Sequence, residues 1–256
     1  MNDAEWLSAA DATDLWAFVR AERRFNRNGV KNPAGEEDEY NQRLLYLLGV
    51  SVCRRLEPLF PDPCCQRMIQ IAEAYAEGTA TLDELEDAHE AIPDTTDYEA
   101  AVRAAVDAVF WLSPDDYKVI RGVDIATDAA GYLHAIAAGV LPARATQREG
   151  KAIWKHPAFL AGKEAEERVV CDLIRDIFGN PFRPIAFDTA WLSWHCGLLV
   201  SMAQKMYDSR DFSDIPVLAD ALEEAGCSDQ DIVDHCRQPG EHVRGCWIVD
   251  LLLGKD

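Results

Sequence analysis

Five side chains of the kinds that bind transition metals lie close together near the C-terminal end of the sequence. They are Cys227, His235, Cys236, His242 and Cys246. Thiolate sulfur and imidazole nitrogen are preferred ligands of zinc, and four of them in a tetrahedron form a structural site. His242 and Cys246 are four residues apart, so they would share one face of a helix. The segment therefore indicates zinc binding, with a structural site favoured over a catalytic one.

A second interpretation of the same segment stays open. The spacing matches no standard zinc finger, because the segment contains no Cys-x-x-Cys knuckle. Free cysteine is among the most buried residue types. The three cysteines could therefore be small core residues, and the two histidines could be capping or hydrogen-bonding groups.

The usual catalytic motifs do not occur in the sequence. It has no glycine-rich phosphate loop, no Gly-x-Ser-x-Gly elbow and no His-Glu-x-x-His. His195 and Cys196 are neighbours on a predicted helix, where adjacent side chains point about 100° apart, so the histidine would not activate the thiol. No catalytic residue is predicted. A weaker alternative is an enzyme whose site combines carboxylates with His134 or His195 from distant helices.

The loop at residues 178–184 is a candidate interaction site. Two prolines and a glycine restrict its backbone. Its candidate contact residues are Asn180, Phe182 and Arg183. Aromatic and arginine side chains are enriched in interface hot spots. The alternative is that Phe182 folds back onto the core and Arg183 pairs with Asp176 or Asp188.

Composition limits the class of partner. The chain has 256 residues, 48% of them hydrophobic, and a formal net charge of −20. Nucleic-acid binding needs a basic face that neutralises phosphates, so neither nucleic acid nor an anionic membrane is expected as a partner. The one basic stretch, residues 144–156, is interpreted as a solvated connector. Another protein is the expected partner, and the sequence does not indicate a small-molecule ligand.

Targeting signals and cysteine usage predict the compartment. The first residues are acidic and lack the cationic and apolar stretches of a signal peptide. No apolar run approaches the roughly 20 residues that a membrane span requires. Eight cysteines in a long chain of this kind indicate reduced, buried thiols rather than disulfides. A cytoplasmic protein is expected.

Apolar side chains recur with helical spacing along most of the chain, which predicts an all-α fold of roughly nine or ten helices without a substantial sheet. The clearest predicted helices are residues 14–25, 39–57, 162–178 and 189–207. Predicted capping boxes start helices at Thr81 and at Thr96. The predicted organisation is an N-terminal half, residues 1–141, a connector, 142–158, and a C-terminal half, 159–256, which could also form one continuous domain.

Three C-terminal strings resemble a large paralogous family of uncharacterised proteins from planctomycete bacteria. They are residues 173–184, 218–227 and 235–255, with looser similarity over the first 80 residues. The family often has a Cys-x-Cys-Cys run before an Arg pair, whereas this sequence has only Cys53 there. The resemblance therefore implies no N-terminal metal site. It brings no activity with it, and it implies that the C-terminal segment acts as a unit.

These observations favour a non-enzymatic protein-interaction or adaptor module as the function. The alternative is a zinc-binding protein that uses residues 227–246.

Overall fold

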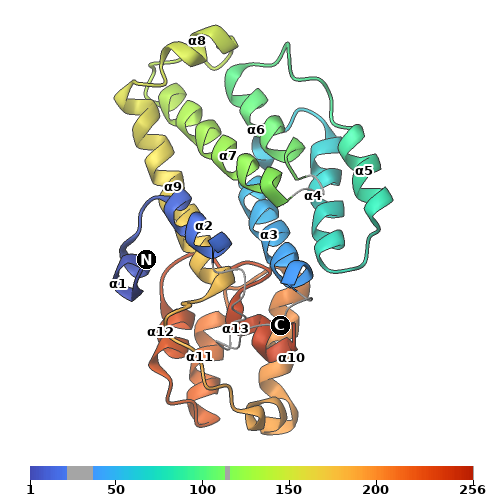
Figure 1. Ribbon diagram of the computed structural model, residues 1–256, viewed down its shortest axis with the longest axis vertical. Coiled ribbons are helices and arrows are strands. Elements are labelled where there is room, and N and C mark those ends of the chain that lie inside the picture. Colours follow the sequence, from blue (N-terminus) through green and yellow to red (C-terminus); the bar gives the residue numbers. More distant parts are fainter. Residues whose placement is uncertain (22–36, 113–115, 256) are drawn as a thin grey trace. The chain divides into compact units, whose positions relative to one another are not determined.

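Every regular element of the computed structural model is a helix within the residues that the structure describes, 1–21, 37–112 and 116–255 (Figure 1). The predicted all-α fold is confirmed. None of the helices in these ranges combines the length and the apolar composition needed to cross a membrane. The last four residues of the helix predicted over residues 14–25 lie outside the described residues.

The chain forms two compact units. The C-terminal unit comprises residues 1–9, 13–40 and 172–256, and the middle unit comprises residues 10–12 and 41–171. One boundary between the units falls within helix α9 (Pro157–Phe178), and another falls at the end of the first turn of α3 (Glu37–Arg54). The predicted connector, residues 142–158, lies inside the middle unit and contains helix α8 (Gln147–Ala152), which Thr146 starts with a capping box.

Helices of the middle unit pack through buried aliphatic and small side chains. In chain order they are α3 (Glu37–Arg54), the short 3-10 helix η1 (Glu57–Leu59), α4 (Pro63–Ala76), α5 (Leu82–Glu90), α6 (Ala100–Phe110), α7 (Asp116–Ala137), α8 and most of α9. Leu47, Met68 and Val106 are fully buried, so α3, α4 and α6 all contribute to the core. Gly131 of α7 lies against Phe159, and Gly162 of α9 lies against His134, so these two helices approach closely where a side chain is missing.

The C-terminal unit carries the metal-ligand side chains predicted above. Its helices are α1 (Asp3–Ser8), α2 (Ala12–Ala21), the end of α9, the 3-10 helix η2 (Thr189–Cys196), α10 (Leu198–Ser209), α11 (Ile215–Glu224), α12 (Gln230–Arg237) and α13 (Trp247–Leu253). In Figure 1, α10 lies beside α13 and α11 lies beside α12. Met206, Leu218, Ile232 and Ile248 belong to the apolar core between these helices.

One of the two predicted capping boxes is present in the structure, and the other is not. Thr81 and Glu84 form the predicted capping box at the start of α5. The box predicted at Thr96 is wrong, because Thr96 donates its hydroxyl to Asp94 and α6 begins only after Glu99. A carboxylate two residues upstream competes for the threonine, as short polar side chains often do in turns.

The helix predicted over residues 189–207 is also interrupted. Its first part is the 3-10 helix η2, and the left-handed backbone of His195, Cys196 and Gly197 separates η2 from α10. A glycine tolerates this conformation without steric cost, so Gly197 marks the break. His195 and Cys196 are exposed there.

Substitution of Gly162 by alanine should destabilise the middle unit. A Cβ atom at this position would lie 2.8 Å from the carbonyl oxygen of Ala130 and 3.2 Å from the Cα atom of Gly131. Overpacking of this kind costs about 1–3 kcal/mol. Urea denaturation should show that loss for Gly162→Ala and a change below about 0.5 kcal/mol for Gly240→Ala. Gly240 is the control because its added Cβ would meet no atom within 4 Å. Equal stabilities would contradict the close approach.

Candidate metal centre

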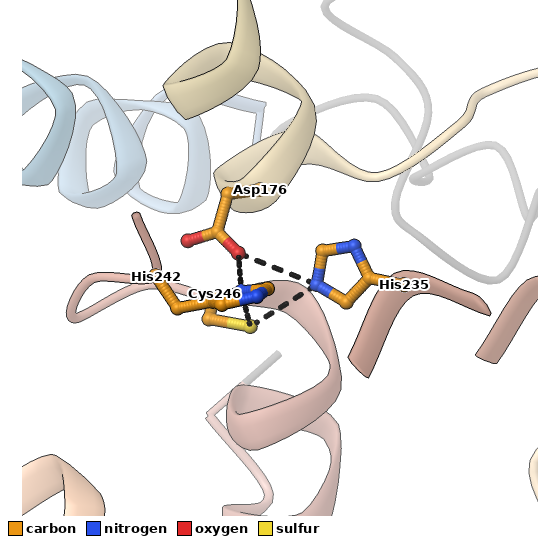
Figure 2. Close-up of side chains that lie close together, drawn as sticks. All are labelled: Asp176, His235, His242 and Cys246. Carbon is orange, nitrogen blue, oxygen red and sulfur yellow. Dashed lines mark hydrogen bonds and ion pairs between the residues drawn. The ribbon is translucent and has the colours of Figure 1, made fainter. Parts of the chain in front are cut away.

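Four side chains converge in the C-terminal unit: Asp176, His235, His242 and Cys246 (Figure 2). One potential ligand atom from each lies within 4.8 Å of those of the other three. The side chains of Asp176, His235 and His242 are at least nine-tenths buried, and Cys246 is fully buried. The group is therefore enclosed and is not a cluster on the surface.

Three different segments bring these residues together. Asp176 lies in the last turn of α9 and His235 in the last turn of α12. His242 belongs to the loop that follows α12, and Cys246 immediately precedes α13. Gly245 has a φ of 93°, a left-handed conformation that lets the loop turn just before Cys246. The site thus depends on where two helices end and a third begins.

The carboxylate of Asp176 is the centre of the hydrogen-bond network. Its Oδ1 atom lies 2.6 Å from His242 Nδ1 and 3.3 Å from His235 Nε2. Its Oδ2 atom accepts a hydrogen bond of 3.0 Å from the backbone N–H of Val243. One oxygen thus faces the two imidazoles, while the other fixes the orientation of the carboxylate against the loop.

The Cys246 sulfur completes the group. Sγ lies 3.3 Å from His235 Nε2 and 3.9 Å from His242 Nδ1. Trp247 closes one side, since its ring lies 4.9 Å from that of His235, centroid to centroid. Gly179 lies against this tryptophan and has a φ of 66°, a left-handed conformation that favours glycine.

Burial and hydrogen bonding act in opposite directions on the ionisable groups. Burial raises the pKa of Asp176, but hydrogen bonds and charge from His235 and His242 outweigh it and lower that pKa to about 2. Burial, reinforced by the negative charge of Asp176, raises the pKa of the Cys246 thiol well above its ordinary value. Without a cation at the centre, the site therefore holds a carboxylate and a neutral thiol.

The contacts of His235 and Cys246 within the group are close in length to the ligand separations of a zinc site. Zinc bonds of 2.0–2.3 Å in a tetrahedron place ligand atoms about 3.3–3.8 Å apart. The contacts of His235 Nε2 with Asp176 and Cys246 meet this range, and the 3.9 Å between Cys246 and His242 is close to it. The 2.6 Å between Asp176 and His242 is a hydrogen-bond length and would have to lengthen.

A catalytic role for Cys246 is not supported by the same geometry. A nucleophilic cysteine needs partial exposure and a lowered pKa. Cys246 is 0% exposed, and its pKa is raised. The proximity of a thiol, imidazoles and a carboxylate is therefore better suited to holding a cation than to attacking a substrate.

The structure brings together three of the five side chains that the sequence singled out. His235, His242 and Cys246 belong to the group, whereas Cys227 and Cys236 do not. Both are buried in the apolar core of the C-terminal unit. Burial raises the pKa of Cys227, and it raises that of Cys236 to about 12, so both are neutral core thiols.

Asp176 was not predicted as a ligand, because it lies 59 residues before His235 in the sequence. One signal could have identified it. Asp176 follows the buried Leu173 by three residues and precedes the buried Ile177, so it falls on the apolar face of α9. A carboxylate on such a face needs a buried partner, because an isolated buried charge is very costly.

The loop residues Asn180, Phe182 and Arg183 contact the N-terminal segment of the same unit. Asn180 and Arg183 both bind the carboxylate of Asp3, and the Phe182 ring stacks on Phe18. Arg183 does form ion pairs with carboxylates, as the predicted alternative required. The partners of Arg183, however, are Asp3 and Asp231. Asp176 instead faces His235, His242 and Cys246, and these four residues are called the metal-ligand group below.

Comparison with known proteins returned no matching family, curated protein or solved structure. The resemblance to the planctomycete family stays a prediction.

Asp176 should contribute strongly to stability even without metal. We expect Asp176→Asn to lower the free energy of unfolding by about 2–4 kcal/mol, because a buried network loses its acceptor charge and the amide turns N–H donors toward imidazoles. Urea denaturation of chelator-treated protein would measure the loss. Glu164→Gln is the matched control, because this α9 carboxylate is 63% exposed and should change stability little. A stability of Asp176→Asn equal to that of the control would show that the hydrogen bonds are unimportant.

Proposed function

We propose that the C-terminal unit is a zinc-binding module and that the metal has a structural role. The observation that carries the proposal is the enclosed group of four ligand atoms from Asp176, His235, His242 and Cys246, all within 4.8 Å of one another. Four protein ligands fill a tetrahedral coordination sphere and leave no position for a substrate, which is the arrangement of structural sites.

Charge balance supports a divalent cation at this position. Binding of zinc deprotonates a thiol ligand, so the filled site would contain one thiolate, one carboxylate and two neutral imidazoles. The two negative charges of the thiolate and the carboxylate balance the two positive charges of Zn²⁺. A buried site without net charge avoids the large cost of an uncompensated ion.

The surrounding groups also suit metal binding. Val243 N–H holds the oxygen of Asp176 that does not face the imidazoles, and the side-chain amide of Gln238 lies 3.3 Å from His235 Nδ1. A hydrogen bond at the distant ring nitrogen is the usual means of orienting a histidine ligand. The amide of Gln238 can supply an acceptor there, because its oxygen and nitrogen are interchangeable by a flip.

One polar atom opposes binding. His242 Nε2 is buried and has no hydrogen-bond partner among the described residues. If Nδ1 binds the metal, Nε2 must carry the proton, and an unpaired buried donor costs about 1–3 kcal/mol. Structural zinc binds with about 10–16 kcal/mol in zinc-finger peptides, so the metal term exceeds this cost.

A metal at this position would connect elements that are too short to be stable by themselves. Helix α12 has 8 residues and α13 has 7. Isolated helices shorter than about 12–15 residues are marginal in water, so their stability comes from contacts with the rest of the unit. One ion would attach both helices and the intervening loop to the end of α9.

Zinc stoichiometry tests the proposal directly. Protein purified without chelator and then dialysed against zinc should retain about one zinc ion per chain, as expected for one tetrahedral site. Cys246→Ala and His242→Ala should lose it. Elemental analysis and competition with a chromophoric chelator would measure both the amount and the affinity.

The two cysteines outside the group provide matched controls. Cys236→Ala and Cys227→Ala remove thiols from the same segment and the same core, and they should retain zinc with unchanged affinity. Substoichiometric zinc in the unsubstituted protein would refute the proposal. Loss of zinc in the Cys227 or Cys236 variants, with Cys246→Ala unaffected, would refute the assigned ligands.

Chelation should also lower thermal stability. Removal of a ligand that binds only the folded state lowers the unfolding temperature, and zinc should restore it. In Cys246→Ala, the chelator should have no effect, because no metal is bound. A melting curve that is the same with and without chelator in the unsubstituted protein would contradict a structural role.

A protein-interaction role, the function favoured by the sequence, stays a prediction. It is compatible with a structural metal site, since zinc-stabilised modules commonly serve as scaffolds for binding surfaces.

A further inference from the structure

The C-terminal unit holds the first helix of the chain in the manner of a bound peptide. Helix α1 has 6 residues, and Asn2 and Glu5 close it with a capping box. A helix this short does not persist alone in water, so its contacts must stabilise it. The side chains that hold its polar groups, Arg175, Asn180 and Arg183, lie more than 160 positions further along the chain.

One arginine binds the C-terminal end of this helix. Arg175 donates from Nε and Nη2 to the carbonyl oxygen of Trp6, at 3.2 and 2.9 Å, and from Nη2 to that of Ala9, at 2.5 Å. The last carbonyl groups of a helix lack partners within it and carry partial negative charge. The guanidinium of Arg175 donates hydrogen bonds to these carbonyl oxygens, and its positive charge offsets their partial negative charge.

A second arginine and an asparagine bind the other end. Arg183 Nη2 and Asn180 Nδ2 each donate to the carboxylate of Asp3 at 2.7 Å, one to each oxygen. Arg183 also donates to Asp231 of α12 at 2.7 Å, and this contact fixes the guanidinium in position. The carboxylate in the first turn of the helix is thereby recognised by both charge and geometry.

An aromatic anchor lies between the two polar ends. Trp6 is 1% exposed and packs against Phe18, with ring centroids 5.9 Å apart. Phe18 in turn stacks on Phe182 at 5.2 Å. A buried tryptophan flanked by arginine contacts is the usual composition of an interface hot spot.

We propose that this surface is a recognition site for a short acidic helix of another protein, and that residues 1–9 occupy it as an internal ligand. The partner would present a carboxylate in its first turn and a tryptophan three residues later, as Asp3 and Trp6 do here. The site consists of Arg175, Asn180, Phe182 and Arg183. It uses the loop residues singled out in the sequence and does not depend on zinc.

The experiment uses the full-length chain with its internal ligand weakened. In Asp3→Ala/Trp6→Ala, α1 loses both anchors, and the site becomes accessible. A fluorescent peptide of residues 1–10, amidated at its C-terminus, should bind this variant in an anisotropy titration. It should bind the unsubstituted chain at least about 30-fold more weakly, the difference expected when a hot spot already fills the site.

Two controls separate recognition from general adhesion. The same peptide with Trp6→Ala should bind about 30-fold more weakly, because it lacks the anchor. Adding Arg183→Ala to the double variant should weaken binding of the original peptide by about tenfold, because the carboxylate loses its charged partner. Zinc content, measured on each variant, should stay that of the unsubstituted chain.

Loss of the buried Trp6 could unfold the unit in the double variant, and circular dichroism would detect this. The single variant Asp3→Ala keeps Trp6, so it tests the site in that case. Asp3→Ala should bind the peptide more tightly than the unsubstituted chain does. Absence of binding to a folded double variant, or equal binding to Asp3→Ala and the unsubstituted chain, would overturn the proposal. Equal binding of the two peptides would also overturn it.

Discussion

The buried carboxylate of Asp176 is the constraint on which the C-terminal unit depends. A charged group that is 1% exposed is tolerated only if its surroundings supply partners for both oxygens. Those partners come from α12 and from the loop before α13, so the end of α9 cannot take its position unless both are in place. The apolar core brings the helices together, and the contacts of the carboxylate join the end of α9 to α12 and to the loop before α13.

The last turn of α9 directs polar side chains toward different neighbours. Arg175 and Asp176 are adjacent, and successive residues on a helix point about 100° apart. Arg175 therefore reaches the carbonyl groups at the end of α1, while Asp176 points into the metal-ligand group. Gly179 then ends the helix in a left-handed conformation and lies against Trp247, whose ring packs on His235. This short stretch sets the geometry of both candidate sites.

The sequence predicts the fold class well, because helical periodicity and capping are local properties. It points to His235, His242 and Cys246 as candidate ligands because ligand residue types cluster in one segment. It could not separate Cys246 from Cys236, since both are buried thiols with histidine nearby in sequence, and only the packing of α12 decides which sulfur meets the imidazoles. The partners of Arg183 were missed for the same reason: Asp3 lies 180 positions away in the chain.

Helix α12 links the two candidate sites physically. Asp231 binds Arg183, and His235, one turn later on the same helix, faces Asp176. Ile232 and Cys236, each the next residue along the helix and so turned by about 100°, are buried in the core. A displacement of this short helix would therefore move two groups at once. One is the Arg183 guanidinium, which binds Asp3, and the other is the His235 imidazole of the metal-ligand group. The two candidate sites therefore share α12 as a structural support, although none of the side chains that bind Asp3 is a candidate zinc ligand.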